Sequence, residues 1–363
     1  MKSVYIHIPF CKNICSYCDF CKFYYKEDWV HKYLDSLYKE IEARYQRDEI
    51  KTIYIGGGTP STLSYPQLDR LFECVDILDK SKLKEFTFEC NIEDINESLL
   101  NYLHRQGVTR LSIGVQTFNK ELLKVLGRIY SENSIDKIKL AKKYFNVNVD
   151  LIYAIPGQTL DNLNSDLDIL LSLDIDHIST YSLIIEEHTK LYIDKISNID
   201  EELDYQMYQL ICRRLSNYHH YEISNFAKEG CESIHNLTYW NNDEYYGFGL
   251  SSSGYINNIR YDNTKNLNKY LKGEYIYHKE KIDLKKKIEN EFILGLRKIV
   301  GINKQNFYDN YHVNIKKIGI VQELLEKNKL EEDNNNIFIP SHLLYTSNDI
   351  LINFIDLIDT NIV

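Results

Sequence analysis

Three cysteines lie close together near the start of this chain: Cys11, Cys15 and Cys18, in the sequence HIPFCKNICSYCDF. Three thiolates on one short loop can hold an iron-sulfur cluster, but they leave one iron of a four-iron cubane without a protein ligand. The amino and carboxylate groups of S-adenosylmethionine can chelate such an open iron. An electron from the cluster can then cleave the sulfonium to give a 5'-deoxyadenosyl radical. The spacing therefore predicts a 4Fe-4S site in which the cofactor supplies the reactive chemistry.

Other uses of the cysteines fit the pattern less well. Zinc sites usually pair their ligands in two separate C-x2-C knuckles, whereas the spacing here is C-x3-C-x2-C and no second knuckle follows. A further alternative stays open: with Cys21 as a fourth ligand, every iron of the cluster would have a thiolate and none could bind another ligand. The remaining cysteines are scattered, so we expect reduced, packed thiols rather than a disulfide framework at Cys74, Cys90, Cys212 and Cys231.

Charge and hydropathy narrow the choice of partners. The chain has 363 residues and a formal net charge of -10, and no basic block offsets this charge, which argues against nucleic acid as a partner. No apolar run reaches the length of a membrane span. With unpaired cysteines and no secretory segment, we expect a reducing cytoplasmic location. The sequence leaves open peripheral membrane association and the choice between monomer and homodimer.

The first half alternates short apolar runs with longer amphipathic ones, which is the pattern of a βα series. Helical stretches include Val30 to Tyr45, Tyr65 to Ile77 and Leu160 to Leu173. The expected strands are Ser3 to Ile8, Thr52 to Gly57, Glu85 to Cys90, Thr109 to Val115, Asn146 to Tyr153 and His177 to Leu183. Six such units predict an α/β fold with an open partial (β/α)6 TIM-like barrel, not a closed eightfold one.

Polar residues collect where these strands end. The carboxyl ends of parallel strands share one edge of the sheet, and ligands bind there. The cysteine loop follows the first strand, and the next strands carry at or near their ends Gly57, Gly58 and Thr59, then Glu89 and Asn91, then Gln116, then Asp150. We therefore expect residues that are distant in sequence to line one mouth of the barrel.

Motifs spread in order over most of the chain carry a family resemblance: YIHIPFC (Tyr5 to Cys11), GGGTPS (Gly56 to Ser61), RLSIGVQTF (Arg110 to Phe118), DLIYAIPGQT (Asp150 to Thr159), YEISNFA (Tyr221 to Ala227) and HNLTYW (His235 to Trp240). With these motifs the chain resembles radical S-adenosylmethionine proteins. Within that superfamily it is similar to the oxygen-independent coproporphyrinogen III oxidases and their heme-chaperone relatives.

The resemblance implies a set of cofactor-binding residues. Cys11, Cys15 and Cys18 match the cluster ligands. Glycines allow close approach of the backbone, and carboxylate, amide and guanidinium groups suit the ribose hydroxyls and the carboxylate of the ligand. The matching positions for S-adenosylmethionine are Tyr5, Gly57, Gly58, Thr59, Glu89, Gln116, Arg128 and Asp150, with Tyr17 where the family has an aromatic residue near adenine.

Two features of the cysteine segment distinguish the two branches of this group. The oxidases carry a motif that resembles C-x3-C-x2-C-x-C, with a long extension before it, whereas this chain has Phe20 at the position of the extra cysteine and only ten residues before Cys11. Both features match the heme-chaperone branch, whose later segment carries H-N-x-x-Y-W. Here that segment supplies His235, Asn236, Tyr239 and Trp240.

The HNLTYW segment has two interpretations. An imidazole can ligate heme iron, and neighbouring aromatic side chains can cover the porphyrin face. On spacing alone, a structural role in a loop and core is the commoner outcome. The resemblance favours heme binding, so the segment is our predicted heme site.

Three units are expected along the chain: the radical SAM partial barrel at residues 1–190, a barrel extension carrying HNLTYW at residues 191–275, and a small, mainly helical, winged-helix-like domain at residues 276–363. The acidic run from Glu331 to Asp333 argues against DNA binding by the last unit.

The resemblance implies a heme chaperone that binds a 4Fe-4S cluster, S-adenosylmethionine and heme, and that transfers heme to apo-proteins. Two alternatives stay open: an oxygen-independent coproporphyrinogen III oxidase, which decarboxylates propionates with the deoxyadenosyl radical, and a non-catalytic redox or iron sensor. The sequence does not decide whether S-adenosylmethionine is cleaved or only bound, or which protein receives heme.

Overall fold

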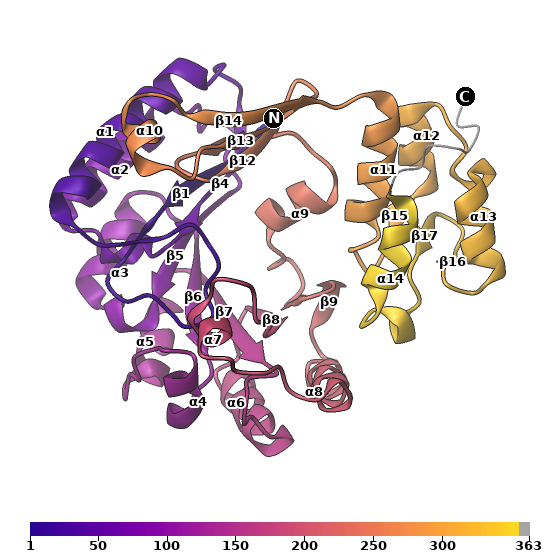
Figure 1. Cartoon of the computed structure of the whole chain (residues 1–363), viewed down its shortest axis with the longest axis horizontal. Helices are drawn as coiled ribbons and strands as arrows, with labels where there is room; N and C mark the ends of the chain where they lie inside the picture. Colours follow the sequence, from indigo (N-terminus) through magenta and orange to yellow (C-terminus); the bar gives the residue numbers. More distant parts are fainter. Residues whose placement is uncertain (356–363) are drawn as a thin grey trace.

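A twelve-stranded sheet organises the protein, whose computed structural model describes residues 1–355 (Figure 1). Hydrogen-bonded neighbours follow the order β14 (Ile276–Lys281), β13 (Ile259–Asn263), β12 (Ser253–Ile256), β11 (Tyr245–Phe248), β1 (Lys2–Ile8), β4 (Ile50–Gly57), β5 (Glu85–Asn91), β6 (Arg110–Gln116), β7 (Asn146–Tyr153), β8 (His177–Ser182), β10 (Asn225–Ala227) and β9 (His219–Glu222).

The six central strands, β1 and β4 to β8, are the ones expected from sequence, and all pair in parallel. Alternate side chains point to opposite faces of a strand, so Val4, Ile6 and Ile8 are buried on one face of β1 while Tyr5 and His7 occupy the other. Because β1 also pairs with β11, and β8 with β10, the barrel does not close. The predicted open partial barrel is confirmed.

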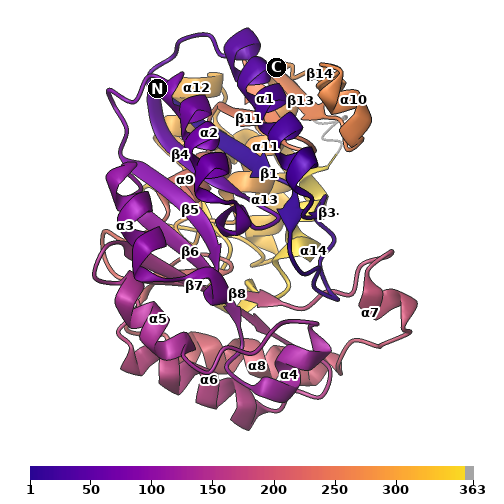
Figure 2. The ribbon, with the colours of Figure 1, turned by 90° about the vertical axis from the view of Figure 1, so that its left-hand side faces the viewer.

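Helices cover the outer side of the central strands (Figure 1, Figure 2). Their starts are written in the sequence: Ser64 and Gln67 form a capping box on one helix, and Thr159 and Asn162 form another. The helices of this unit are α1 (Glu27–Arg44), α2 (Tyr65–Asp76), α3 (Glu97–Arg105), α4 (Lys120–Val125), α5 (Ser134–Ala141), α6 (Leu160–Ser172), α7 (Lys190–Ile193) and α8 (Glu201–Arg214).

The segment after α8 extends the sheet at both edges. Strands β9 and β10 add to the β8 side, and β11 to β14 add to the β1 side, with α9 (Ile234–Trp240) and α10 (Leu267–Leu271) between them. Strand β14 lies beyond the boundary expected at residue 275, yet it pairs with β13 and belongs to the sheet. Its side chains are mostly exposed, so no apolar alternation revealed it.

A small unit follows β14 and packs around a second group of aromatic residues. The rings of Phe292 and Phe354 stack with centroids 4.4 Å apart, and Phe307 is buried beside them. Its elements are α11 (Leu284–Gly295), β15 (Ile302–Asn303), α12 (Lys304–Tyr311), α13 (Gly319–Glu326), β16 (Glu331–Glu332), β17 (Asn336–Phe338) and α14 (Ser347–Leu351). Helices around a three-stranded sheet match the expected winged-helix-like unit; its predicted last residues, 356–363, lie outside the described part.

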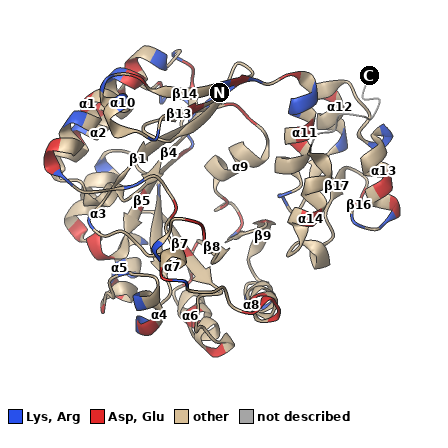
Figure 3. Cartoon of the chain, viewed as in Figure 1, with Lys and Arg blue, Asp and Glu red and all other residues tan. Residues whose placement is uncertain are grey.

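Acidic and basic residues are interspersed along α1, as Figure 3 shows. In the small unit, Lys304 and Lys316 both pair with Glu332, so these cations are partly neutralised. No helix within residues 1–355 combines the length and the apolar character needed to cross a bilayer.

Candidate cluster and S-adenosylmethionine site

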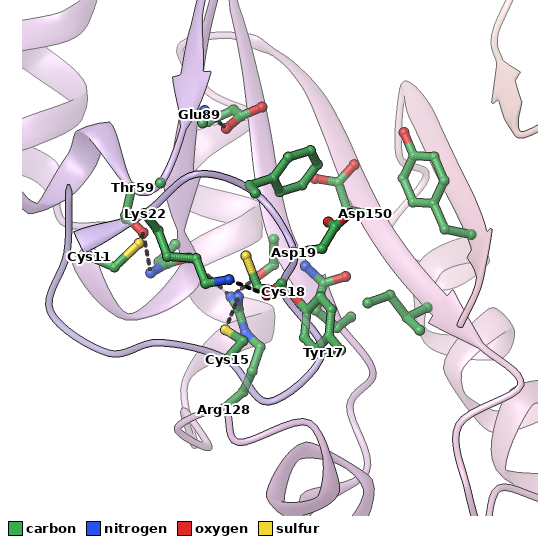
Figure 4. Close-up of a pocket in the computed structure, with 18 of the residues that line it drawn as sticks. Cys11, Cys15, Tyr17, Cys18, Asp19, Lys22, Thr59, Glu89, Arg128 and Asp150 are labelled. Carbon is green, nitrogen blue, oxygen red and sulfur yellow. Dashed lines mark hydrogen bonds between the residues drawn. The ribbon is translucent and has the colours of Figure 1, made fainter. Parts of the chain in front are cut away.

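A cavity of about 560 Å³ opens where the central strands end (Figure 4). It brings together every residue predicted for the cluster and for S-adenosylmethionine except Tyr5. The predicted residues on its wall are Cys11, Cys15, Cys18, Tyr17, Gly57, Gly58, Thr59, Glu89, Gln116, Arg128 and Asp150. The strand ends therefore converge on one mouth, as expected from sequence, and the assignment of these residues to ligands stays a prediction.

The cysteine loop is fixed at its two ends by short strands. Strand β2 (Phe10–Cys11) pairs in parallel with β3 (Phe23–Tyr24), and the Tyr25 N–H donates to the Cys11 carbonyl over 2.9 Å. The middle of the loop is held by Ser16, whose N–H donates to the Leu126 carbonyl and whose carbonyl accepts from the Leu191 N–H. These contacts hold the loop over the barrel mouth.

The GGGTP turn requires glycines because the backbone of the cysteine loop and the Glu89 side chain pack closely against it. A Cβ on Gly58 would lie 2.9 Å from the carbonyl oxygens of Ile8 and Phe10, and a Cβ on Gly56 would lie 2.5 Å from the Glu89 carboxyl carbon. Gly57 has a φ of 112°, in the region that favours glycine. The GGGTP turn is thus needed for packing of the protein itself, before any ligand is considered.

The three thiols line the cavity without meeting at a point. Within residues 1–355, no three His, Cys, Asp or Glu side chains converge as they would on a single metal ion. Thiolates spread around a cavity wall suit a polynuclear iron-sulfur cluster, which is larger than one ion. Burial raises the pKa of the Cys11 thiol to about 11 and also raises that of Cys18, so metal binding has to displace these protons.

Arg128 connects the cysteine loop to the strand ends. Its guanidinium donates to the Gly114 carbonyl over 2.6 Å and to Asn91 Oδ1 over 3.1 Å, and it lies 3.6 Å from Cys15 Sγ. These contacts place a permanent positive charge on the cavity wall beside the Cys15 sulfur. Gln116 ends β6 next to it with a φ of 70°, a backbone conformation that is uncommon for glutamine.

Two carboxylates occupy another part of the cavity wall (Figure 4). Glu89 accepts from the Tyr54 hydroxyl over 2.7 Å and from the Gly57 N–H over 2.9 Å. Burial raises its pKa to about 7, and the neighbouring charge of Asp150 acts in the same direction. Burial likewise raises the pKa of Asp150, which accepts from Ser112 and Asn148. Both can accept hydrogen bonds from sugar hydroxyls.

Tyr5 and Cys21 lie outside the cavity. The Tyr5 hydroxyl bonds His7 Nδ1 over 2.9 Å, and its ring lies 6.0 Å from that of Tyr54. Cys21 is not on the cavity wall, and its Sγ lies 3.9 Å from the Lys265 carbonyl. The structure thus separates Cys21 from the three cysteines of the predicted cluster site.

The HNLTYW segment forms α9, and the structure does not bring it to the cavity. His235 is 1% exposed; its Nδ1 bonds the Thr52 hydroxyl over 2.7 Å and its Nε2 bonds the Tyr239 hydroxyl over 2.8 Å. Burial lowers its pKa to about 3. Both ring nitrogens are therefore hydrogen-bonded to other side chains in this conformation, and neither is free to ligate a heme iron.

The other predicted heme residues lie nearby on the same helix. Asn236 begins the first turn, where its N–H donates to the Ser233 hydroxyl over 3.2 Å. The Trp240 indole N–H has no partner among the described residues, and the Arg297 guanidinium lies 5.5 Å from its ring. The His235 ring packs 5.1 Å from that of Tyr54, so α9 supports the cavity wall from behind.

Asn91 lies on the cavity wall with Glu89, as expected from its place at the end of the third predicted strand. It donates to Thr59 Oγ1 over 3.3 Å and accepts from Arg128, so it joins the glycine turn to the arginine. Because it stands two residues after Glu89 on β5, the two-residue period of a strand puts both side chains on one face. Tyr54, Ser112 and Tyr181 also line the cavity, but no sequence pattern distinguished them.

Comparison with known proteins adds to this geometry. The model of the Radical SAM superfamily matches residues 5–170. The heme chaperone HemW of Lactococcus lactis subsp. lactis is 38% identical in an alignment of length 369, gaps included, that covers 97% of this chain and 97% of that protein. The heme chaperone HemW of Bacillus subtilis is 37% identical in an alignment of length 360 that covers 93% of this chain and 95% of that one.

Among solved structures, the coproporphyrinogen III oxidase HemN from Escherichia coli, described as a radical SAM enzyme, is similar with a TM-score of 0.84. The two are 21% identical, and the match covers 97% of this chain and 89% of that one. At this identity the likeness shows the shared fold alone.

Proposed function

The chain belongs to the radical SAM superfamily and, within it, to the heme-chaperone family that includes HemW of Lactococcus lactis and Bacillus subtilis; from this premise we propose that it binds heme and transfers it to apo-proteins. One observation carries the proposal. The match to the chaperones extends over nearly the whole of both chains, whereas the likeness to the oxidase is one of fold. Of the expected alternatives, neither the oxidase nor the sensor gains comparable support.

The proposed cofactors are a 4Fe-4S cluster and S-adenosylmethionine. Cys11, Cys15 and Cys18 would hold three irons of the cluster. The fourth iron would be open to chelation by the amino and carboxylate groups of S-adenosylmethionine. The wall residues suit that ligand: Arg128 would pair with its carboxylate, and Glu89 would accept from its ribose. We assign the rest of the ligand to Tyr17, Gly57, Gly58, Thr59, Gln116 and Asp150. Tyr5, predicted with them from sequence, is left out because it lies off the cavity wall and bonds His7.

The heme site is proposed on α9, at His235, Asn236, Tyr239 and Trp240. Ligation by His235 requires the imidazole to release its bond to Thr52 or to Tyr239, because both nitrogens are engaged. The unpartnered Trp240 N–H supports this location, since a propionate could accept from it. Apo-proteins are the proposed recipients, and the cytoplasm is the proposed location.

The first experiment is an anaerobic hemin titration of cluster-reconstituted protein, followed by absorption spectroscopy. We expect saturable binding of about one heme per chain, as one axial site predicts. His235→Ala should weaken binding and shift the spectrum. The control is His278→Ala, because His278 is exposed and contacts Asp262 on the surface.

The outcomes separate the function from the site. Saturable binding that persists unchanged in His235→Ala would keep the chaperone proposal and remove His235 as the ligand. Absence of saturable binding in the wild-type protein would remove the chaperone proposal, and coproporphyrinogen turnover would be measured next.

A further inference from the structure

A chain of buried polar groups leads away from the cavity behind Asp150. The Asn148 amide donates to Asp150 Oδ1 over 2.9 Å, and its oxygen lies 2.6 Å from His177 Nδ1. The second ring nitrogen of His177 lies 2.8 Å from the Tyr221 hydroxyl. His177 is fully buried, Asn148 and Tyr221 are each 4% exposed, and none of the three lines the cavity.

The direction of each hydrogen bond follows from the donors available. The Asn148 amide nitrogen donates to Asp150 and Ser112, so its oxygen must accept, and His177 Nδ1 carries the proton. Burial lowers the pKa of His177 well below its ordinary value, with Arg110 acting in the same direction. The imidazole is therefore neutral, and Nε2 accepts from the Tyr221 hydroxyl.

The Asp150 carboxylate is held by this arrangement on both oxygens. Oδ1 accepts from Asn148, and Oδ2 accepts from the Ser112 hydroxyl over 3.1 Å. Ser112 in turn accepts from Asn148 over 2.9 Å, so Asn148 orients both of the groups that bond the carboxylate. The orientation of Asn148 depends on His177 and on Ser179, which donates to the same oxygen over 3.0 Å.

The other end of the chain reaches α9. The Tyr221 hydroxyl accepts from the Ser233 N–H over 3.3 Å, at the residue that caps this helix. Glu85 of β5 accepts from the N–H groups of Ile234 and His235, each over 2.9 Å, and so fixes the first turn. A buried set of hydrogen bonds thus runs from the cavity wall to the start of the helix.

We propose that His177 is a positioning residue for S-adenosylmethionine binding: it orients Asn148 so that Asp150 presents its carboxylate to the cavity, and it anchors this arrangement to α9 through Tyr221. The proposal rests on the proposed function, because Asp150 is assigned to the ligand. Fixing the carboxylate before binding lowers the ordering cost of the complex. His177 touches no ligand and acts only through Asn148.

The test measures S-adenosylmethionine affinity of cluster-reconstituted protein by anaerobic equilibrium dialysis. We expect His177→Leu to weaken binding about tenfold, and Tyr221→Phe to weaken it about threefold, because the second change removes only one hydroxyl. His177→Gln can still donate to Asn148 and accept from Tyr221, so its affinity should recover to near the wild-type value.

The decisive measurement is a double-mutant cycle with Asp150→Ala. If His177 acts through Asp150, His177→Leu should cause no further loss in the Asp150→Ala background. The matched control is His220→Leu. His220 lies one residue before Tyr221, stacks on Phe226 at 4.1 Å and bonds the Ile223 carbonyl, with no link to Asp150, so its affinity should stay at the wild-type value.

Unchanged affinity in His177→Leu, or equal losses with and without Asp150, would overturn the inference and leave the proposed function standing. Wild-type protein that carries its cluster but binds no S-adenosylmethionine would refute the cofactor assignment itself, and the inference with it. If His177→Leu does not fold, Tyr221→Phe measured with and without Asp150→Ala carries the same test, because its threefold loss should disappear in the Asp150→Ala background.

Discussion

The cavity wall and helix α9 differ in how their polar groups are satisfied. At the cavity, the sulfurs of Cys11, Cys15 and Cys18 and the carboxylates of Glu89 and Asp150 all face the same open space. On α9, by contrast, both nitrogens of His235 and the hydroxyl of Tyr239 bond one another or the neighbouring Thr52.

Two motifs that are equally recognisable in the sequence therefore differ in the fold: one lines an open cavity, and the other is buried among its own hydrogen-bond partners. A carboxylate oxygen that accepts one hydrogen bond from the protein can accept another from a ligand, so Glu89 and Asp150 can bind a ligand at the cavity while they keep their protein partners. An imidazole nitrogen takes part in one hydrogen bond, so His235 must lose a partner before it can ligate a metal. We therefore expect changes at the cavity to alter ligand binding first, and changes on α9 to alter stability first.

The largest change in ligand binding is expected at the cysteines. Cys15→Ser should abolish the cluster, lowering iron from about four atoms per chain to nearly none, because two thiolates do not retain a cubane. Iron analysis and the visible absorption spectrum measure the loss. Thermal unfolding of the iron-free variant should match that of iron-free wild-type protein.

Cys21→Ser is the matched control, since Cys21 lies in the same segment but off the cavity wall. It should keep the iron content and spectrum of the wild-type protein. Loss of iron in this variant would restore the alternative of a cluster closed by four thiolates. A normal cluster in Cys15→Ser would remove the site assignment altogether.

The second prediction concerns α9. His235→Ala should lower the free energy of unfolding by about 2–4 kcal/mol, because it leaves the Thr52 and Tyr239 hydroxyls without partners and opens a cavity. Urea-induced unfolding measures the change. S-adenosylmethionine affinity should stay near the wild-type value, since α9 lies behind the wall.

Here the exposed His278→Ala variant should stay within about 0.5 kcal/mol of the wild-type protein. A His235→Ala protein as stable as the wild type would mean that the bonds to Thr52 and Tyr239 contribute little. The contrast between the two regions would then disappear.

The smallest effect is expected from a cavity carboxylate. The Glu89 pKa is raised to about 7, so between its ordinary value and pH 7 the folded protein holds a proton that the unfolded chain releases. The free energy of unfolding of the metal-free protein should therefore fall as pH rises through this range. Glu89→Gln should remove about 1–3 kcal/mol of that fall and weaken S-adenosylmethionine binding about tenfold.

Glu222→Gln offers a comparison, because burial also raises the pKa of Glu222 to about 7, but this residue is not on the cavity wall. It should flatten the pH dependence similarly and leave the affinity unchanged. Equal affinities in Glu89→Gln and wild type would contradict the assignment of Glu89 to the ligand.

Much of the fold could be predicted because its signals are local. Strand β7 has the bounds expected from its apolar run, since both faces of a central parallel strand are buried. Glu89 and Asp150 could be predicted to share a cavity because parallel strands end at one edge. Strand β14 could not be predicted, because its exposed side chains show no alternation and only pairing with β13 defines it.

Spacing and periodicity act between close neighbours in the chain, so the sequence was enough to predict the cysteine loop, the order of the βα units and the strand ends that form the cavity. Which polar groups can still bind a ligand follows only from the folded chain. Thr52 and His235 are 183 positions apart, and Asn148 and His177 are 29 apart, yet each pair shares a buried hydrogen bond. Such pairing depends on packing in three dimensions, and no local pattern encodes it.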